Sequence, residues 1–137
     1  MGTPEVPFGL QHYTVDGSVV LQFSGELDIW ANTVLSPHVV RQLDRPCPRV
    51  IVDLRPTTFL DAGGLRLLVR IHKQVTAAGG TLRVVLGRPR VRRVIRLARL
   101  ERVFTVLDGF PASLAAPGED DGSGPAPPEQ PSAVRPG

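Results

Sequence analysis

Residues 49–70 read RVIVDLRPTTFLDAGGLRLLVR, and this stretch joins two kinds of hydrophobic pattern. Arg49–Leu54 is a compact apolar run, which is typical of a strand buried on both faces. Asp61 then precedes an apolar pattern of helical period, so we expect it to be the N-cap of a helix that runs through Val75. A buried strand followed by a capped helix indicates an α/β fold.

The sequence on either side of this stretch extends the alternation. The dipeptide Asp16-Gly17 predicts a hairpin turn, and a helix is expected from about Asn32 to Leu43, starting late at Ser36 if Pro37 is its first helical residue. The other predicted elements are strands His12–Val15 and Val19–Phe23, a loop at Arg55–Leu60, strand Thr81–Leu86, helix Pro89–Arg99, strand Val103–Leu107 and a short terminal helix Pro111–Ala115. The order ββαβαβαβα favours one α/β domain with a mixed, mostly parallel sheet covered by helices.

Composition suits a single soluble globular domain, because 42% of the 137 residues are hydrophobic and 21% are charged. Residues 115–137 hold six of the 14 prolines, four acids and one arginine, without apolar periodicity, so we expect a disordered acidic tail. We interpret residues 1–7 as a flexible lead-in and residues 8–114 as the folded domain. One cysteine, no apolar run near the ~18 residues of a membrane span and no secretory signal indicate a cytoplasmic protein.

Positive charge is concentrated in one segment. Arg88–Arg102 carries seven arginines and one glutamate, or +6, whereas the whole chain is +3. Helical spacing places Val91, Val94, Ile95 and Ala98 on one arc and Arg92, Arg93, Arg96 and Arg99 on another. A solvated or protein-docking face is favoured over a nucleic-acid interface, because the segment has no aromatic side chain that could stack on bases.

No arrangement of residues predicts catalysis or a metal site. The serines lie outside any Gly-x-Ser-x-Gly pattern, the histidines have no ligand spacing, and Cys47 has no activating partner. Ala62-Gly63-Gly64 lacks the rest of a phosphate-binding motif. Glu26 and Asp28 flank a leucine at a strand end, where carboxylates more often cap a helix or solvate a loop. We therefore expect a binding protein with no cofactor and no metal rather than an enzyme.

Four separated pieces of sequence lie in register with one known family. They are Phe23–Asp28, Val52–Leu54, Asp61–Leu65, and Gly79-Gly80 followed by Pro89–Val94. Over residues 8–114 their order and spacing resemble the STAS domain family, specifically the bacterial anti-sigma factor antagonists. The resemblance implies a regulatory binding module that docks on an anti-sigma factor. That partner is itself a serine kinase of the histidine-kinase-like ATPase fold, and docking frees a sigma factor.

The resemblance also implies a partner-binding set: Glu26, Asp28, Asp61, Ala62, Gly63, Gly64 and Leu65. In the family, phosphorylation of a serine in the motif Asp-Ser-Ser/Thr-Gly-Leu abolishes docking, since a phosphate adds about −1.5 to −2 charge at the contact surface. Here the serine position is Ala62 and the next is Gly63, so the usual switch is absent. Gly63 costs about 0.5–1 kcal/mol relative to alanine in a helix, and we expect it to loosen that turn.

Two further interpretations stay open at this stage. A degenerate STAS domain could act as a scaffold or assembly subunit that self-associates and chooses partners through Arg92, Arg93, Arg96 and Arg99. The same arginines could bind nucleic acid, which predicts a steep salt dependence. Phosphate on Thr57 or Thr58 would show that the switch lies elsewhere.

Overall fold

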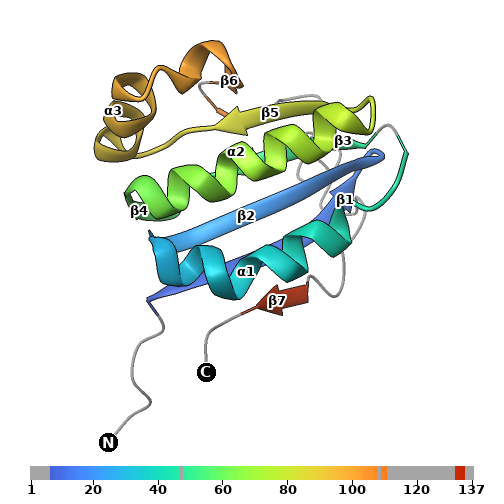
Figure 1. Cartoon of the computed structure of the whole chain (residues 1–137), viewed down its shortest axis with the longest axis horizontal. Helices are drawn as coiled ribbons and strands as arrows, with labels where there is room; N and C mark the ends of the chain where they lie inside the picture. Colours follow the sequence, from blue (N-terminus) through green and yellow to red (C-terminus); the bar gives the residue numbers. More distant parts are fainter. Residues whose placement is uncertain (1–6, 47, 108, 111–131, 135–137) are drawn as a thin grey trace, which may run out of the picture.

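The computed structural model describes residues 7–46, 48–107, 109–110 and 132–134. Its elements run in the order β1 (Phe8–Val15), β2 (Ser18–Leu27), α1 (Ile29–Gln42), β3 (Arg49–Asp53), β4 (Thr57–Leu60), α2 (Ala62–Ala77), β5 (Thr81–Val85), α3 (Pro89–Leu97), the 3₁₀ helix η1 (Leu100–Arg102), β6 (Thr105–Leu107) and β7 (Ser132–Val134). The strands form one seven-stranded sheet in the order β6-β5-β3-β2-β1-β7, with β4 paired to β2 outside that path (Figure 1).

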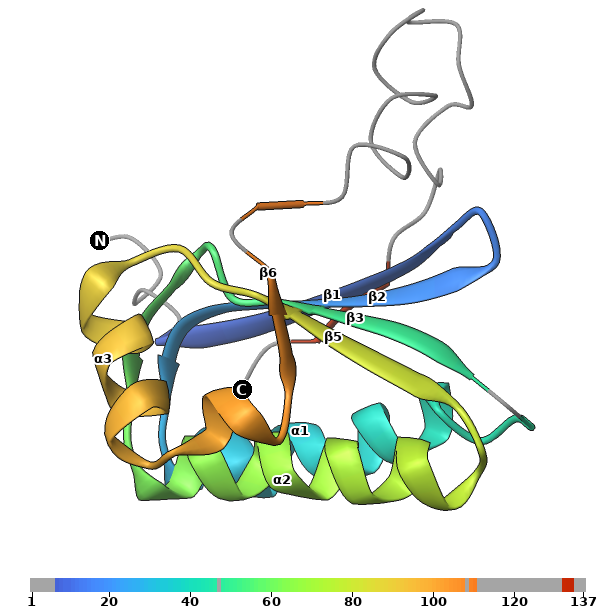
Figure 2. The same ribbon diagram turned by 90° about the horizontal axis from the view of Figure 1, so that it is seen from above.

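The sheet is mixed and mostly parallel, as the sequence predicted. β2 pairs in parallel with β3 and with β4, and β5 pairs in parallel with β3 and with β6. Only the β1–β2 and β1–β7 pairs are antiparallel among the described strands. Figure 2 shows α1 and α2 side by side on one face of the sheet, with α3 at one end.

The main core lies between the sheet and these helices. Side chains such as Phe23, Leu35 and Leu68 are fully buried there. A smaller apolar cluster of Val20, Ile51 and Val85 occupies the opposite face, which α1 and α2 do not cover. The helix-covered face therefore supplies most of the apolar burial.

β4 is an element that the sequence did not predict, because Arg55–Leu60 was expected to be a loop. β2 is ten residues long. It pairs with β3 over Val19–Gln22 and with β4 over Gly25–Leu27, across a register shift between Gly25 and Glu26. Gly25 has a φ of 79°, a conformation that glycine adopts without steric cost. β4 thus depends on hydrogen bonds to β2, which is distant in the sequence. A local sequence pattern does not reveal such a pairing.

α1 begins earlier than predicted, at Ile29 rather than near Asn32, and it runs through Pro37. The expected start at Ser36 and Pro37 is therefore wrong. Pro37 lies on the exposed side of the helix, where water can satisfy the carbonyl group that its missing N–H leaves free. Ser36 is buried within the helix, and its hydroxyl donates a hydrogen bond to Oδ1 of Asn32 at 2.8 Å.

The elements after β5 are shorter than predicted. α3 ends at Leu97 instead of Arg99, and β6 starts at Thr105 instead of Val103. The residues between α3 and β6 include η1, and Phe104 behind it is buried in the main core.

Part of the predicted disordered tail belongs to the sheet. Ser132–Val134 pairs with Leu10–His12 of β1, which corrects the expectation for those three residues. The rest of the tail, the predicted terminal helix, Cys47 and residues 1–6 lie outside the described residues. Pro7 of the predicted lead-in is described, and its carbonyl accepts a hydrogen bond from the backbone N–H of Glu26 at 2.7 Å.

Asp53 forms a buried polar network on the sheet face opposite α1 and α2. Its carboxylate accepts hydrogen bonds from Nε and Nη2 of Arg55, at 2.9 and 2.8 Å, and from Nε2 of Gln22 at 3.0 Å. Burial alone would raise the pKa of Asp53, but the hydrogen bonds from Arg55 and Gln22 outweigh it and hold the pKa below its ordinary value. The network joins β2, β3 and the chain that follows β3.

We expect Arg55→Ala to lower the free energy of unfolding by about 1–3 kcal/mol at neutral pH, because it removes donors from a buried carboxylate. Since the folded-state pKa of Asp53 is depressed, this contribution is present above the ordinary value of 3.8 and is lost as the pH falls through the folded value. Urea denaturation should show the gap between wild type and Arg55→Ala closing below about pH 4.

The exposed variant Arg102→Ala is the matched control, and its stability should stay close to wild type at each pH. A gap for Arg55→Ala that is as large in acid as at neutral pH would show that the ion pair is not its source.

Candidate protein-docking site

Two helix N-termini, each capped by an aspartate, lie side by side at one end of the molecule. Oδ1 of Asp28 accepts a hydrogen bond from the backbone N–H of Ala31 at 2.9 Å, at the start of α1. Oδ1 of Asp61 accepts from the backbone N–H groups of Gly63 and Gly64, at 2.9 and 3.3 Å, at the start of α2. The predicted cap at Asp61 is confirmed, and Asp28 has the same role.

The first turn of α2 lies directly against the junction of β2 and α1. A Cβ added at Gly63 would come closer than 3.0 Å to the backbone N and Cα of Ile29. One added at Gly64 would collide with the carbonyl oxygen of Leu27 in the same way. Both glycines are buried, so the expectation that Gly63 loosens this turn is corrected: the missing side chain allows the close packing.

Three exposed apolar side chains lie at this end. Ile29 and Trp30 are 56% and 50% exposed although they begin a helix, and Phe59 of β4 is also exposed. The Trp30 ring packs edge-on against Phe8, with 5.1 Å between ring centroids, so the indole is held in place. Exposed aromatic and aliphatic side chains of this kind are typical anchors of a protein interface.

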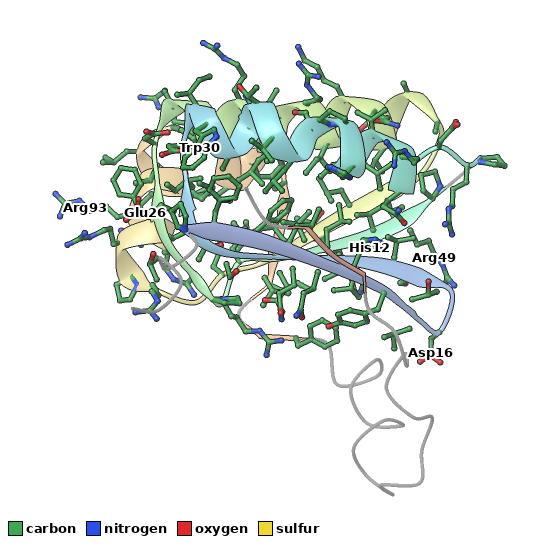
Figure 3. All side chains as sticks on the ribbon, turned by 90° about the horizontal axis from the view of Figure 1, so that it is seen from below. His12, Asp16, Glu26, Trp30, Arg49 and Arg93 are labelled. Carbon is green, nitrogen blue, oxygen red and sulfur yellow. The ribbon has the colours of Figure 1, made fainter. Side chains whose placement is uncertain are left out.

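Sequence reasoning missed these three apolar residues. The available signal was the chain's one tryptophan, two residues after Asp28. Trp30 can be assigned to a helix only once Asp28 is recognised as the N-cap of that helix. Phe59 was missed because its strand was not predicted. Glu26, which was predicted, lies opposite Phe59 in the β2–β4 pairing and is exposed. Figure 3 shows Glu26 and Trp30 at the same end of the molecule.

The structure brings the seven predicted partner-binding residues together, but they do not all reach the surface. Gly63 and Gly64 are buried and shape the turn, while Leu65 is half-buried and packs against the main core. Ala62 is exposed at the first position of α2. Among these residues, direct contact with a partner is therefore left mainly to Ala62 and Glu26.

The two threonines before the motif differ in access. Thr57 is fully buried, and its hydroxyl donates a hydrogen bond to the carbonyl of Phe23 at 2.8 Å. Thr58 is exposed on β4. A modifying enzyme could reach the hydroxyl of Thr58 in the folded protein, whereas the hydroxyl of Thr57 is inaccessible.

The predicted basic face of α3 lies at the same end, since α3 packs against β4. Arg93 and Arg96 are exposed and Arg92 is half-buried, while Val91 and Ile95 face the core, as the helical spacing predicted. Figure 3 shows Arg93 at the same end of the molecule as Glu26.

Arg99 does not belong to this face. It follows the end of α3 in a left-handed conformation with a φ of 60°. Ala98, which was predicted to share the apolar arc, is exposed for the same reason, because the helix has ended.

The described ranges hold no group of three or more histidine, cysteine, aspartate or glutamate side chains that could hold a metal ion. No helix within them is long and apolar enough to cross a membrane.

Replacement of Gly63 by alanine tests the close packing at this end. Alanine is the better helix former by about 1 kcal/mol, so a turn limited by helix propensity would gain stability. We expect the opposite: a loss of roughly 1–3 kcal/mol in the free energy of unfolding, because the added Cβ forces α2 away from Ile29. Ala62→Ser, one residue earlier and exposed, should change stability little. Denaturant titration of wild type, Gly63→Ala and Ala62→Ser measures the three free energies of unfolding. A Gly63→Ala variant that is more stable than wild type would contradict the packing argument.

Comparisons with known proteins agree on one family. The model of the STAS domain matches residues 10–112. The anti-sigma F factor antagonist of Paenibacillus polymyxa is 24% identical over 93 residues, which cover 67% of this chain and 80% of that protein. The crystal structure of an anti-sigma factor antagonist from Mycobacterium paratuberculosis is 26% identical, with a TM-score of 0.71 over 80% of this chain and 92% of that one. SpoIIAA in its unphosphorylated form shares the fold, at 21% identity and a TM-score of 0.61 over 72% of this chain and 87% of that one.

Proposed function

This chain belongs to the STAS domain family, and on that premise we propose that it is an anti-sigma factor antagonist which docks through the end formed by the first turns of α1 and α2. Members of this group are regulatory binding proteins rather than enzymes. The support for the general role is that the relative from Paenibacillus polymyxa and the similar structure from Mycobacterium paratuberculosis both carry this name.

The observation that carries the docking site is the exposed apolar end. Ile29, Trp30 and Phe59 are available for contact, and Glu26 adds one negative charge beside them. The carboxylates of Asp28 and Asp61 are occupied by backbone N–H groups, so their role is to hold the two helix ends in place. An exposed apolar side chain that is already packed in place, as Trp30 is by Phe8, is suited to binding a protein, since binding requires little reordering.

We propose that the partner is an anti-sigma factor of the serine kinase type and that it cannot switch this protein off at the usual position. Ala62 stands exposed where the family motif has serine, so the kinase would find no hydroxyl there. Gly63 offers none either, and the hydroxyl of Thr57 is buried. Docking would then be controlled by the amounts of the two proteins rather than by phosphorylation at this turn.

A scaffold role is the second candidate, and a separate patch favours it. Leu97 at the end of α3 is 72% exposed, and Val103 after η1 is 46% exposed. Leu97 lies in the basic segment and Val103 directly follows it, and exposed apolar side chains of this kind could mediate self-association. Light scattering across a range of protein concentrations distinguishes the roles, because a scaffold of this kind forms oligomers that Leu97→Ser weakens.

We expect the wild-type protein to bind an anti-sigma kinase from its host in the presence of ATP and to remain without phosphate at position 62. Trp30→Ala should weaken this binding roughly 30-fold, because it removes a central apolar anchor of about 2 kcal/mol. Val103→Ala is the matched control and should bind like wild type. Calorimetry measures the affinities, and failure of the wild type to bind any candidate kinase would end the antagonist assignment.

Ala62→Ser should restore the switch. The same kinase is expected to phosphorylate this variant, and the phosphorylated form should lose binding because a charge of about −1.5 to −2 is added to the contact surface. Mass spectrometry locates the phosphate. If it appears on Thr58 of the wild type, the switch has moved and this part of the proposal is wrong.

A further inference from the structure

A row of positive side chains runs along the exposed side of α2. Arg66, Arg70 and Lys73 are spaced by four and three residues, which places them on one face of the helix. The row begins one turn after Ala62, so it continues from the docking end. At a rise of 1.5 Å per residue it extends about 10 Å along the helix.

These three side chains have no carboxylate partner in the part of the chain that the structure describes. The ion pair between Arg55 and Asp53 lies on the other face of the sheet. α2 itself contains no aspartate or glutamate. The three cations line a shallow groove of about 480 Å³ together with Val69 and Gln74. The groove therefore has a positive potential that nothing nearby on α2 offsets.

Exposed apolar side chains lie near both ends of α1, the helix beside this groove. α1 packs alongside α2, and Nε2 of Gln74 donates a hydrogen bond to the carbonyl of Val40 at 3.2 Å. Val40 is exposed, as are Ile29 and Trp30 at the other end of α1. α1 thus presents exposed apolar side chains near its two ends, and α2 presents the three positive side chains.

We propose that this α1–α2 face binds an acidic amphipathic helix of the partner protein. The negative side chains of such a helix would lie along Arg66, Arg70 and Lys73, and its apolar side chains would cover the exposed residues of α1. A nucleic acid matches the charges but has nothing to place on Val40 and Ile29, so a protein segment is the better fit. The inference rests on the proposed function in one respect only. It takes from that proposal a protein partner that also contacts the docking end.

A binding titration with a synthetic peptide tests this surface without the anti-sigma factor. The probe is an 18-residue peptide with leucine at helical spacing and glutamate on its other face, added to the full chain. Trp30 is the protein's one tryptophan and lies half-exposed at this surface, so its fluorescence reports binding. We expect saturable binding that the double variant Arg66→Glu/Arg70→Glu weakens about 10-fold or more.

Arg83→Glu is the matched control, because Arg83 lies on β5 between two core-facing residues and so points to the opposite face of the sheet. This variant also reverses one positive charge, but at a position away from α2. The affinity for the peptide should therefore stay within about 2-fold of wild type. Circular dichroism checks that each variant is folded.

Three results would overturn the proposal: no saturable binding, equal weakening in Arg83→Glu, or a 20-base-pair DNA duplex that binds as tightly as the peptide and responds to the same double variant. The last result would make the face a nucleic-acid interface. Peptide binding to α2 in a protein that binds no anti-sigma kinase would leave this inference standing and remove the proposed function, so the two failures are distinguishable.

Discussion

The arrangement of this protein depends on how closely the first turn of α2 lies against the start of α1. At Gly63 and Gly64 there is no room for a side chain, because the backbone of Ile29 and the carbonyl of Leu27 occupy the space. α1 follows β2 and α2 follows β4, and β2 and β4 are themselves paired. This one contact therefore fixes two helices and two strand ends relative to one another.

The consequence is a shared end at which both helix N-termini are capped by an aspartate. Asp28 accepts from one backbone N–H group and Asp61 from two, so these three groups are not available to bind an anion. What remains accessible is a set of apolar side chains around Trp30, held rigid by Phe8. Such a surface suits docking more than chemistry, in keeping with a STAS domain whose motif has Ala62 in the serine position.

The sequence predicted those elements that depend on residues close together in the chain. Asp61 as a cap and the alternation of strands and helices follow from residues close together in the chain. β4 depends on pairing with β2, and its sequence resembles a loop without that partner. The start of α1 was predicted too late because Pro37 is typical of a first helical turn. Here Pro37 lies inside the helix, on its exposed side. The motif positions of the site were predicted by resemblance, whereas its apolar anchors at Ile29 and Trp30 required the structure.

Amide hydrogen exchange, measured on the protein alone and in complex with the anti-sigma factor that we propose as its partner, tests the location of the docking site most directly. The account predicts that binding slows exchange at residues 28–31 and 59–66, where the two helices begin. Exchange in β5 and β6 should stay unchanged. Slowed exchange confined to β5, β6 and η1, with none at the two helix starts, would contradict it.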